Sequence, residues 1–227
     1  MDVLTLIATV PVVVVVALDT QRCVPSSWKA QERSISLAVS KINGFYNGFN
    51  EKDNSTVYYD KLNGRSAQLV NFTIGDVYES MKVIVDYKAG KRYLIDFKKN
   101  ECVEHGITWG FNDICIPGNS DQTFGYYLGL DNRKGGYIDA VAFEKRVDYH
   151  GQHADLTVTL TKDLYVPVQV LMRGLDDDTY LAISLLSDVV SPFPPEESDV
   201  FDPPSGCTEG GVSFEVLPGA MAALLGH

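Results

Sequence analysis

The fold class follows from residues 81–98, which read MKVIVDYKAGKRYLIDFK. Apolar residues recur at every second position in both halves of this stretch, at Met81, Val83, Val85 and Tyr87 and then at Tyr93, Ile95 and Phe97. A period of two is typical of a β-strand with one wet face. Because only Ala89-Gly90-Lys91 separates the two runs, the sequence predicts an antiparallel hairpin.

The same alternation recurs along the chain. Asn63-Gly64 is a strong hairpin signal and joins predicted strands at residues 57–62 and 65–74. Further strands are predicted at residues 137–149, 154–162, 164–173 and 179–190. No segment has persuasive helical spacing, although short helical turns are expected near residues 114–121 and 194–201. Antiparallel strands at this spacing favour an all-β sandwich or an open barrel.

Two of these strands, residues 137–149 and 179–190, are apolar on both faces. We therefore expect both faces of each strand to be covered. One face would meet the core, and the other would meet a second sheet, a partner subunit or a cavity.

Residues 1–20 are predicted to be a signal peptide. The apolar stretch from Val3 to Leu18 is shorter than the about 20 residues that a membrane helix needs. Asp2 stands where a basic residue is usual, which leaves an uncleaved anchor as the alternative. No later segment is apolar enough to span a bilayer, so we expect one domain at residues 21–207 and a flexible tail at residues 208–227.

The formal net charge is −11, and basic residues do not cluster. This argues against nucleic acid as a partner. The four cysteines contain no Cys-x-x-Cys pair, so we expect two disulfides, with three pairings open at this stage. Asn54-Ser55-Thr56 and Asn71-Phe72-Thr73 are acceptor triplets for glycosylation in a secreted protein.

Candidate catalytic groups are sparse. His150 and His153 flank Gly151, so a hairpin turn is the favoured interpretation over a metal site or a hydrolytic site. Asp176-Asp177-Asp178 lacks an EF-hand context and is interpreted as an acidic turn rather than a calcium loop. The chain has no Gly-x-Ser-x-Gly motif, and paired carboxylates for glycoside cleavage stay open because their pairing is spatial. We do not expect an enzyme.

Six fragments, in this order, together resemble the ependymin-related proteins. They are Cys23-x-Pro25-x-x-Trp28, Tyr59-Asp60-x-x-Asn63-x-Arg65, Ile95-Asp96 followed by Cys102, Trp109 followed by Ile116-Pro117-x-Asn119-Ser120, Tyr165-Val166-Pro167-Val168, and Val200-Phe201-x-Pro203-Pro204-Ser205-x-Cys207. The resemblance implies two stacked, curved antiparallel sheets that enclose a hydrophobic pocket, similar to bacterial lipoprotein carriers. It also implies a secreted or lysosomal glycoprotein without enzymatic activity that tends to form a homodimer.

The resemblance also bears on the cysteines. The family pattern implies the disulfide Cys102–Cys207, which leaves Cys23–Cys115 as the second pair. The family cysteine before the Tyr-Pro-Val stretch is replaced here by Leu164, and Cys115 is extra. Calcium binding is associated with the family, but its ligands do not carry over to particular residues, so the metal site is unknown.

Our leading hypothesis is a non-catalytic protein that binds lipids, fatty acids or glycolipids in a deep apolar pocket. The alternative is a calcium-binding glycoprotein of the extracellular matrix that acts in cell adhesion. Alternation alone does not distinguish apolar residues that fill the core from apolar residues that line a pocket. The predicted pocket residues are Val83, Val85, Tyr87, Tyr93, Ile95, Phe97, Leu156, Val158, Leu160, Val168 and Val170.

Overall fold

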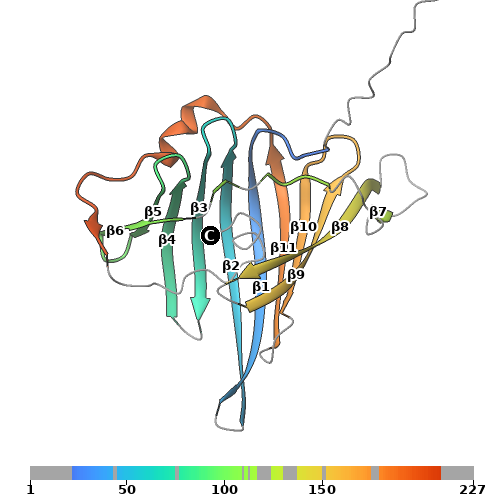
Figure 1. Cartoon of the computed structure of the whole chain (residues 1–227), viewed down its shortest axis with the longest axis horizontal. Coiled ribbons are helices and arrows are strands. Elements are labelled where there is room, and N and C mark those ends of the chain that lie inside the picture. Colours follow the sequence, from blue (N-terminus) through green and yellow to red (C-terminus); the bar gives the residue numbers. More distant parts are fainter. Residues whose placement is uncertain are drawn as a thin grey trace, which may run out of the picture.

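The structure is a computed structural model that describes residues 22–42, 45–74, 77–108, 110–111, 113–116, 124–129, 137–149, 152–174 and 179–210. Its strands form one sheet with the order β12-β6-β5-β4-β3-β2-β1-β11-β10-β9-β8-β7 (Figure 1). The strands are β1 (Ser27–Ile42), β2 (Phe45–Asp60), β3 (Arg65–Ile74), β4 (Val77–Asp86), β5 (Lys91–Asp96), β6 (Glu101–Gly106), β7 (Phe124–Gly129), β8 (Tyr137–Tyr149), β9 (Gln152–Thr161), β10 (Pro167–Gly174), β11 (Thr179–Val190) and β12 (Thr208–Glu209).

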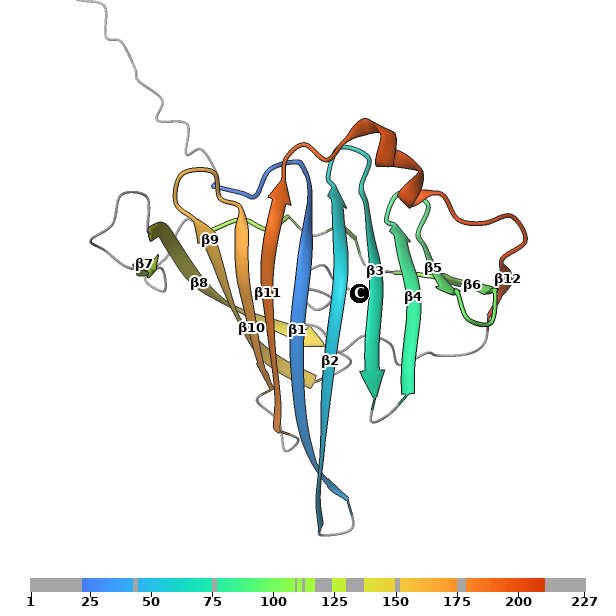
Figure 2. The ribbon, with the colours of Figure 1, turned by 180° about the vertical axis from the view of Figure 1, so that it is seen from behind.

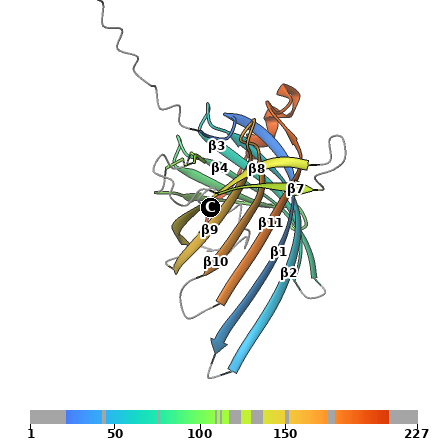
Figure 3. The same ribbon diagram turned by 90° about the vertical axis from the view of Figure 1, so that its right-hand side faces the viewer.

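Two antiparallel meanders build this sheet. Strands β1 to β6 form one meander and β7 to β11 form the other, and the pairing of β1 with β11 joins them. The predicted all-β architecture with curved antiparallel strands is confirmed. Two stacked sheets were expected, but the β1–β11 ladder joins the two meanders into one sheet. Strand β8 crosses obliquely over one face of this sheet (Figures 1 and 2). Figure 3 shows the curvature of the strands from the side.

Most of the predicted strands are present. Strands β3, β8 and β11 have the predicted bounds. The predicted hairpin at residues 81–98 is β4–β5, and Gly64, with φ of +62°, closes the β2–β3 turn. Residues 195–201 form the 3-10 helix η1 (Pro195–Phe201), as expected for that region. Residues 114–116 are not helical, and residues 117–121 lie outside the described residues.

We call the face that carries Trp28, Val57 and Leu156 the inner face. A large buried cluster on this face joins β1 and β2 to β8, β9, β10 and β11. The segment after β6 crosses the same face and adds Ile114 and Ile116 to the cluster (Figure 1). The disulfide Cys23–Cys115 fastens this segment to the chain just before β1. A second inner cluster lies on β3, β4 and β5.

The opposite, outer face is covered by η1 over β2 to β5. There the aromatic rings of Phe193 and Phe201 pack against Tyr58, with ring centroids 6.1 and 6.3 Å away. Glu197 of η1 accepts hydrogen bonds from Lys29 and Tyr58. These contacts hold the chain segment that runs from the end of β11 to the edge of the sheet formed by β6 and β12.

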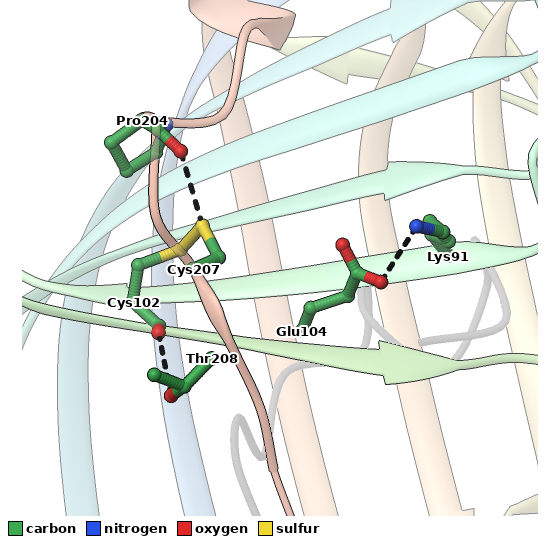
Figure 4. The surroundings of a disulfide bond; sticks show 6 residues. All are labelled: Lys91, Cys102, Glu104, Pro204, Cys207 and Thr208. Carbon is green, nitrogen blue, oxygen red and sulfur yellow. Dashed lines mark hydrogen bonds and ion pairs between the residues drawn. A yellow bond between two sulfur atoms is a disulfide. The ribbon is translucent and has the colours of Figure 1, made fainter.

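At that edge, Cys207 is bonded to Cys102 of β6 (Figure 4). Just beyond Cys207, β12 pairs in parallel with β6. The first two residues of the predicted flexible tail therefore form a short strand. The structure contains both expected disulfides: Cys102–Cys207, which the family resemblance implied, and Cys23–Cys115, the pair that remained. The predicted signal peptide at residues 1–20 and residues 211–227 of the tail lie outside the described residues. In the described ranges, no helix has the length and apolarity to cross a bilayer.

Candidate functional site

The inner face gathers most of the predicted pocket residues. Six of them, from strands β4, β9 and β10, are buried there: Val83, Val85, Leu156, Val158, Leu160 and Val170. The ladders explain this, because Val158 lies between Phe143 and Val170 on neighbouring strands, and residues directly opposite share a face. These side chains therefore lie on one face of the sheet, divided between the two inner clusters.

The structure corrects the direction of three predicted residues. In the β4–β5 ladder, Leu94 pairs with Val83 and takes the inner position. Tyr93 and Ile95 consequently lie on the outer face in the cluster with η1, and Phe97 is exposed. The cause is the register, because the turn pairs Asp86 with Lys91 and so matches odd residues of one strand to even residues of the next.

Two further predicted residues lie at the margins of the inner face. Tyr87 follows β4, packs against the second inner cluster and contacts Phe111 edge to face, with ring centroids 5.0 Å apart. Val168 is half-buried at a register shift in β10 between Pro167 and Gln169. An extra residue at such a bulge is displaced from the alternation, which explains why its direction did not follow from the sequence.

A group of polar side chains interrupts the apolar inner face where β11, β1, β2 and β3 meet. We call it the inner polar cluster, and its members are Glu32, Ser34, Asp53, Ser55, Gln68 and Ser184. The ladders bring them together, since Glu32 lies opposite Ser55 and Ser34 lies opposite Asp53. Gln68 pairs with Val57, the inner residue next to Ser55 on β2.

Short hydrogen bonds connect the inner polar cluster. The Ser55 hydroxyl donates to Glu32 Oε2 over 2.6 Å, and Gln68 Nε2 donates to the same oxygen over 2.8 Å. Gln68 Nε2 also lies 3.0 Å from Ser55 Oγ. The Ser34 hydroxyl donates to Asp53 Oδ2 over 2.7 Å. The donors of the cluster are thus directed at one oxygen of each carboxyl group.

Burial decides the protonation of these carboxyl groups. The pKa of Glu32 is raised to about 7. Loss of solvation is the main cause, the nearby Asp53 carboxylate also raises the pKa, and the Ser184 hydroxyl and the hydrogen bonds from Ser55 and Gln68 oppose the rise. Burial also raises the pKa of Asp53, against the hydrogen bonds from Ser34. Glu32 therefore changes charge near neutral pH, which an exposed glutamate does not do.

Four side-chain oxygens of the cluster have no hydrogen-bond partner among the described residues: Glu32 Oε1, Asp53 Oδ1, Gln68 Oε1 and Ser184 Oγ. Unpaired buried polar atoms are uncommon in native proteins and call for an explanation. The sequence holds a signal for this cluster that the strand predictions missed. Glu32 and Ser34 continue the inward register of Trp28 and Ala30, so a carboxyl group occupies a core position of the strand.

The other predicted sites are placed as follows. Asn54 and Asn71 are exposed and lie directly opposite each other on β2 and β3. His153 is exposed in β9, whereas His150 and Asp176-Asp177-Asp178 lie outside the described residues. In the part of the chain that is described, no group of three or more His, Cys, Asp or Glu residues is placed to hold a metal ion.

Comparisons with known proteins agree with the sequence resemblance. The chain is 27% identical over 151 residues to Ependymin-related protein 2 of Haliotis asinina, which covers 64% of this chain and 69% of that protein. Two solved structures are similar at low scores. An uncharacterized conserved protein from Thermus thermophilus has a TM-score of 0.43 and 13% identity, with 82% of this chain and 90% of that chain covered. A LolA superfamily protein from Nitrosomonas europaea has a TM-score of 0.32 and 7% identity, with 78% and 90% covered.

The structural likenesses are too weak to carry an argument about function. The family assignment depends instead on the sequence. The family model described as Ependymin matches residues 77–207, which is more than half of the chain. This chain therefore belongs to the ependymin family.

Proposed function

We propose that this chain is a secreted, non-catalytic protein that binds hydrophobic ligands, with the alkyl part of the ligand lying on the inner face of the sheet. The observation that carries the proposal is that both apolar inner clusters lie on the same face of the sheet. Val83 and Val85 belong to one cluster, and Leu156, Val158 and Val170 belong to the other, all on the same face.

The energetics of such binding are favourable without many polar contacts. Each buried methylene contributes about 0.8 kcal/mol, so about ten buried methylenes contribute on the order of 8 kcal/mol before ordering costs. The curvature of the sheet supports this arrangement, because a curved sheet presents one face to an enclosed chain more fully than a flat sheet does.

The disulfides and the acceptor triplets support the secreted setting. Disulfides persist mainly in oxidising compartments. Asn54 and Asn71 are exposed and lie on the face opposite the inner clusters, so glycans at these positions leave the inner face free. We propose that one or both are glycosylated.

The test is to purify the glycoprotein without detergent, extract it with solvent and analyse the extract for lipid by mass spectrometry. Delipidated protein is then titrated with a fluorescent fatty acid. Co-purified lipid at near-stoichiometric amount, or saturable uptake, supports the proposal. A protein that neither retains lipid nor takes up the probe contradicts it.

A matched pair of variants locates the site. Val83→Thr introduces a hydroxyl group on the inner face at nearly constant volume, and Val190→Thr makes the same change at an exposed position. We expect weaker uptake only in Val83→Thr. Equal affinity in both variants would place the ligand elsewhere.

A further inference from the structure

The inner polar cluster combines burial with unused hydrogen-bonding capacity. Glu32, Gln68 and Asp53 are 1%, 3% and 7% exposed. Each of the three nevertheless carries a side-chain oxygen without a hydrogen-bond partner among the described residues, namely Oε1, Oε1 and Oδ1. The cluster is thus built from polar groups that the described residues satisfy only in part.

Apart from the Ser184 hydroxyl, which can donate or accept and also has no partner among the described residues, the unused capacity is of one chemical kind. The hydroxyl groups of Ser34 and Ser55 donate within the cluster, and Gln68 Nε2 does so as well. What remains on these three side chains is three acceptor oxygens, two of them on carboxyl groups. A complementary ligand group must therefore supply donors, and a positive charge on it would be stabilised by the carboxylates.

No cation of the described protein supplies that charge. The groups that act on the Glu32 carboxyl are Asp53 and Ser55 of β2, Gln68 of β3 and Ser184 of β11. The Asp53 carboxyl group is acted on by the side chain and the backbone of Ser34 on β1. No Lys, Arg or His is among the described groups acting on either carboxyl group, which distinguishes the cluster from an internal salt bridge.

The surroundings of the cluster are apolar along every strand that contributes to it. Val57 follows Ser55 on the inner side of β2, Val70 lies opposite Ser55 on β3, and Met81 lies beyond it on β4. On the other side, Leu186 lies opposite Glu32 on β11, and Val170 lies opposite Ser184 on β10. A ligand whose polar group reaches the cluster therefore meets apolar side chains with the rest of its length.

We propose that the inner polar cluster binds the protonated amine of a long-chain primary amine whose alkyl chain lies on the inner apolar surface. This inference rests on the proposed function and names its ligand class. A primary ammonium group carries three N–H donors, as the lysine side chain does. Their number equals that of the unpartnered acceptor oxygens on Glu32, Asp53 and Gln68.

The charge of Glu32 gives this binding a pH dependence. Since the pKa of Glu32 is raised to about 7, the carboxyl group is neutral in more acidic solution and charged in more basic solution. An alkyl amine stays protonated across this range, because its pKa is close to the about 10.4 of lysine. Amine affinity is therefore expected to increase as the pH rises through neutrality.

The experiment titrates delipidated full-length protein with dodecylamine, dodecanol and dodecanoic acid, which share one chain length. At about pH 8, where Glu32 is ionised, we expect dodecylamine to bind about tenfold more tightly than dodecanol, which corresponds to about 1.4 kcal/mol. At about pH 5.5 this preference should shrink, because a neutral Glu32 attracts the ammonium group less strongly.

Variants test the residues. Glu32→Gln combined with Asp53→Asn should bring dodecylamine to the affinity of dodecanol and leave dodecanol binding unchanged. Glu144→Gln removes an exposed carboxylate from β8 and should keep the preference. If the double variant does not fold, the pH profile of the wild type still decides.

The outcomes separate the two proposals. Equal binding of dodecylamine and dodecanol at both pH values, or an amine preference that survives in the double variant, overturns the amine site but leaves a hydrophobic carrier. If none of the three probes binds, the proposed function itself fails, and the amine site fails with it.

Discussion

Replacing Glu32 by glutamine should change how the stability of this protein depends on pH. The pKa of this carboxyl group is raised in the folded protein from 4.5 to about 7. Between these values the folded state binds more protons than the unfolded state, so the free energy of unfolding falls as the pH rises. At about 1.4 kcal/mol per pKa unit, the loss across this window is on the order of 3 kcal/mol.

Glu32→Gln removes this loss. Its amide oxygen can still accept from Ser55 and Gln68, so the variant keeps the hydrogen bonds of Oε2. We expect the variant to gain about 3 kcal/mol relative to the wild type between about pH 4.5 and about pH 8. For a domain of this size, that gain corresponds to an increase of about 6 to 12 °C in Tm.

The assay is urea unfolding of both proteins at the two pH values. The comparison between variants cancels the other carboxyl groups, which titrate in both proteins. Glu144→Gln, at an exposed position, is the control and should leave the pH dependence unchanged. Parallel pH profiles for the wild type and Glu32→Gln would refute the reasoning, because they would mean that Glu32 is not held in a poorly solvated site.

Three further changes test the fold. Leu160→Ala should cost about 2 to 5 kcal/mol in urea unfolding because it leaves a cavity in the large inner cluster, whereas Leu164→Ala, at an exposed position, should cost little. Replacing Cys102 and Cys207 by serine opens a loop with a sequence separation of 105 and should cost up to about 4.7 kcal/mol; an unchanged urea midpoint would contradict this. Phe201→Ala should cost about 3 kcal/mol and speed amide exchange in β3, and unaltered exchange there would show that η1 does not protect the outer face.

The strands that the sequence predicted well are those with simple alternation. The runs in β4 and β9 follow from apolar residues at every second position, and the Asn63-Gly64 turn marks the β2–β3 hairpin. These strands could be predicted because alternating apolar residues and a turn dipeptide are visible within a short stretch of sequence.

The parts that sequence alone did not predict depend on distant contacts. Strand β1 was missed because its inner positions change from Trp28 and Ala30 to Glu32 and Ser34, which hides the apolar period. The direction of Ile95 was wrong because the β4–β5 register shifts the alternation by one residue. The pairing of β1 with β11 joins segments far apart in the chain, so no local pattern reports it.

The candidate site shows the same division. The sequence identified apolar residues such as Val83 and Leu156 but missed the polar group among them. That group exists only where β11, β1, β2 and β3 lie side by side. Glu32 and Gln68 are distant in sequence, and the sheet alone brings them within 2.8 Å.

The short strand β12 and its disulfide have a consequence for solubility. β6 would otherwise end the sheet on that side. The parallel pairing of β12 with β6, through Thr208 and Glu209, occupies part of the free backbone groups of β6 (Figure 2). Unpaired edge strands recruit strands from other molecules and so promote aggregation. Because the Cys102–Cys207 bond holds this cap in place, a reducing environment would uncover the edge and favour self-association of the protein.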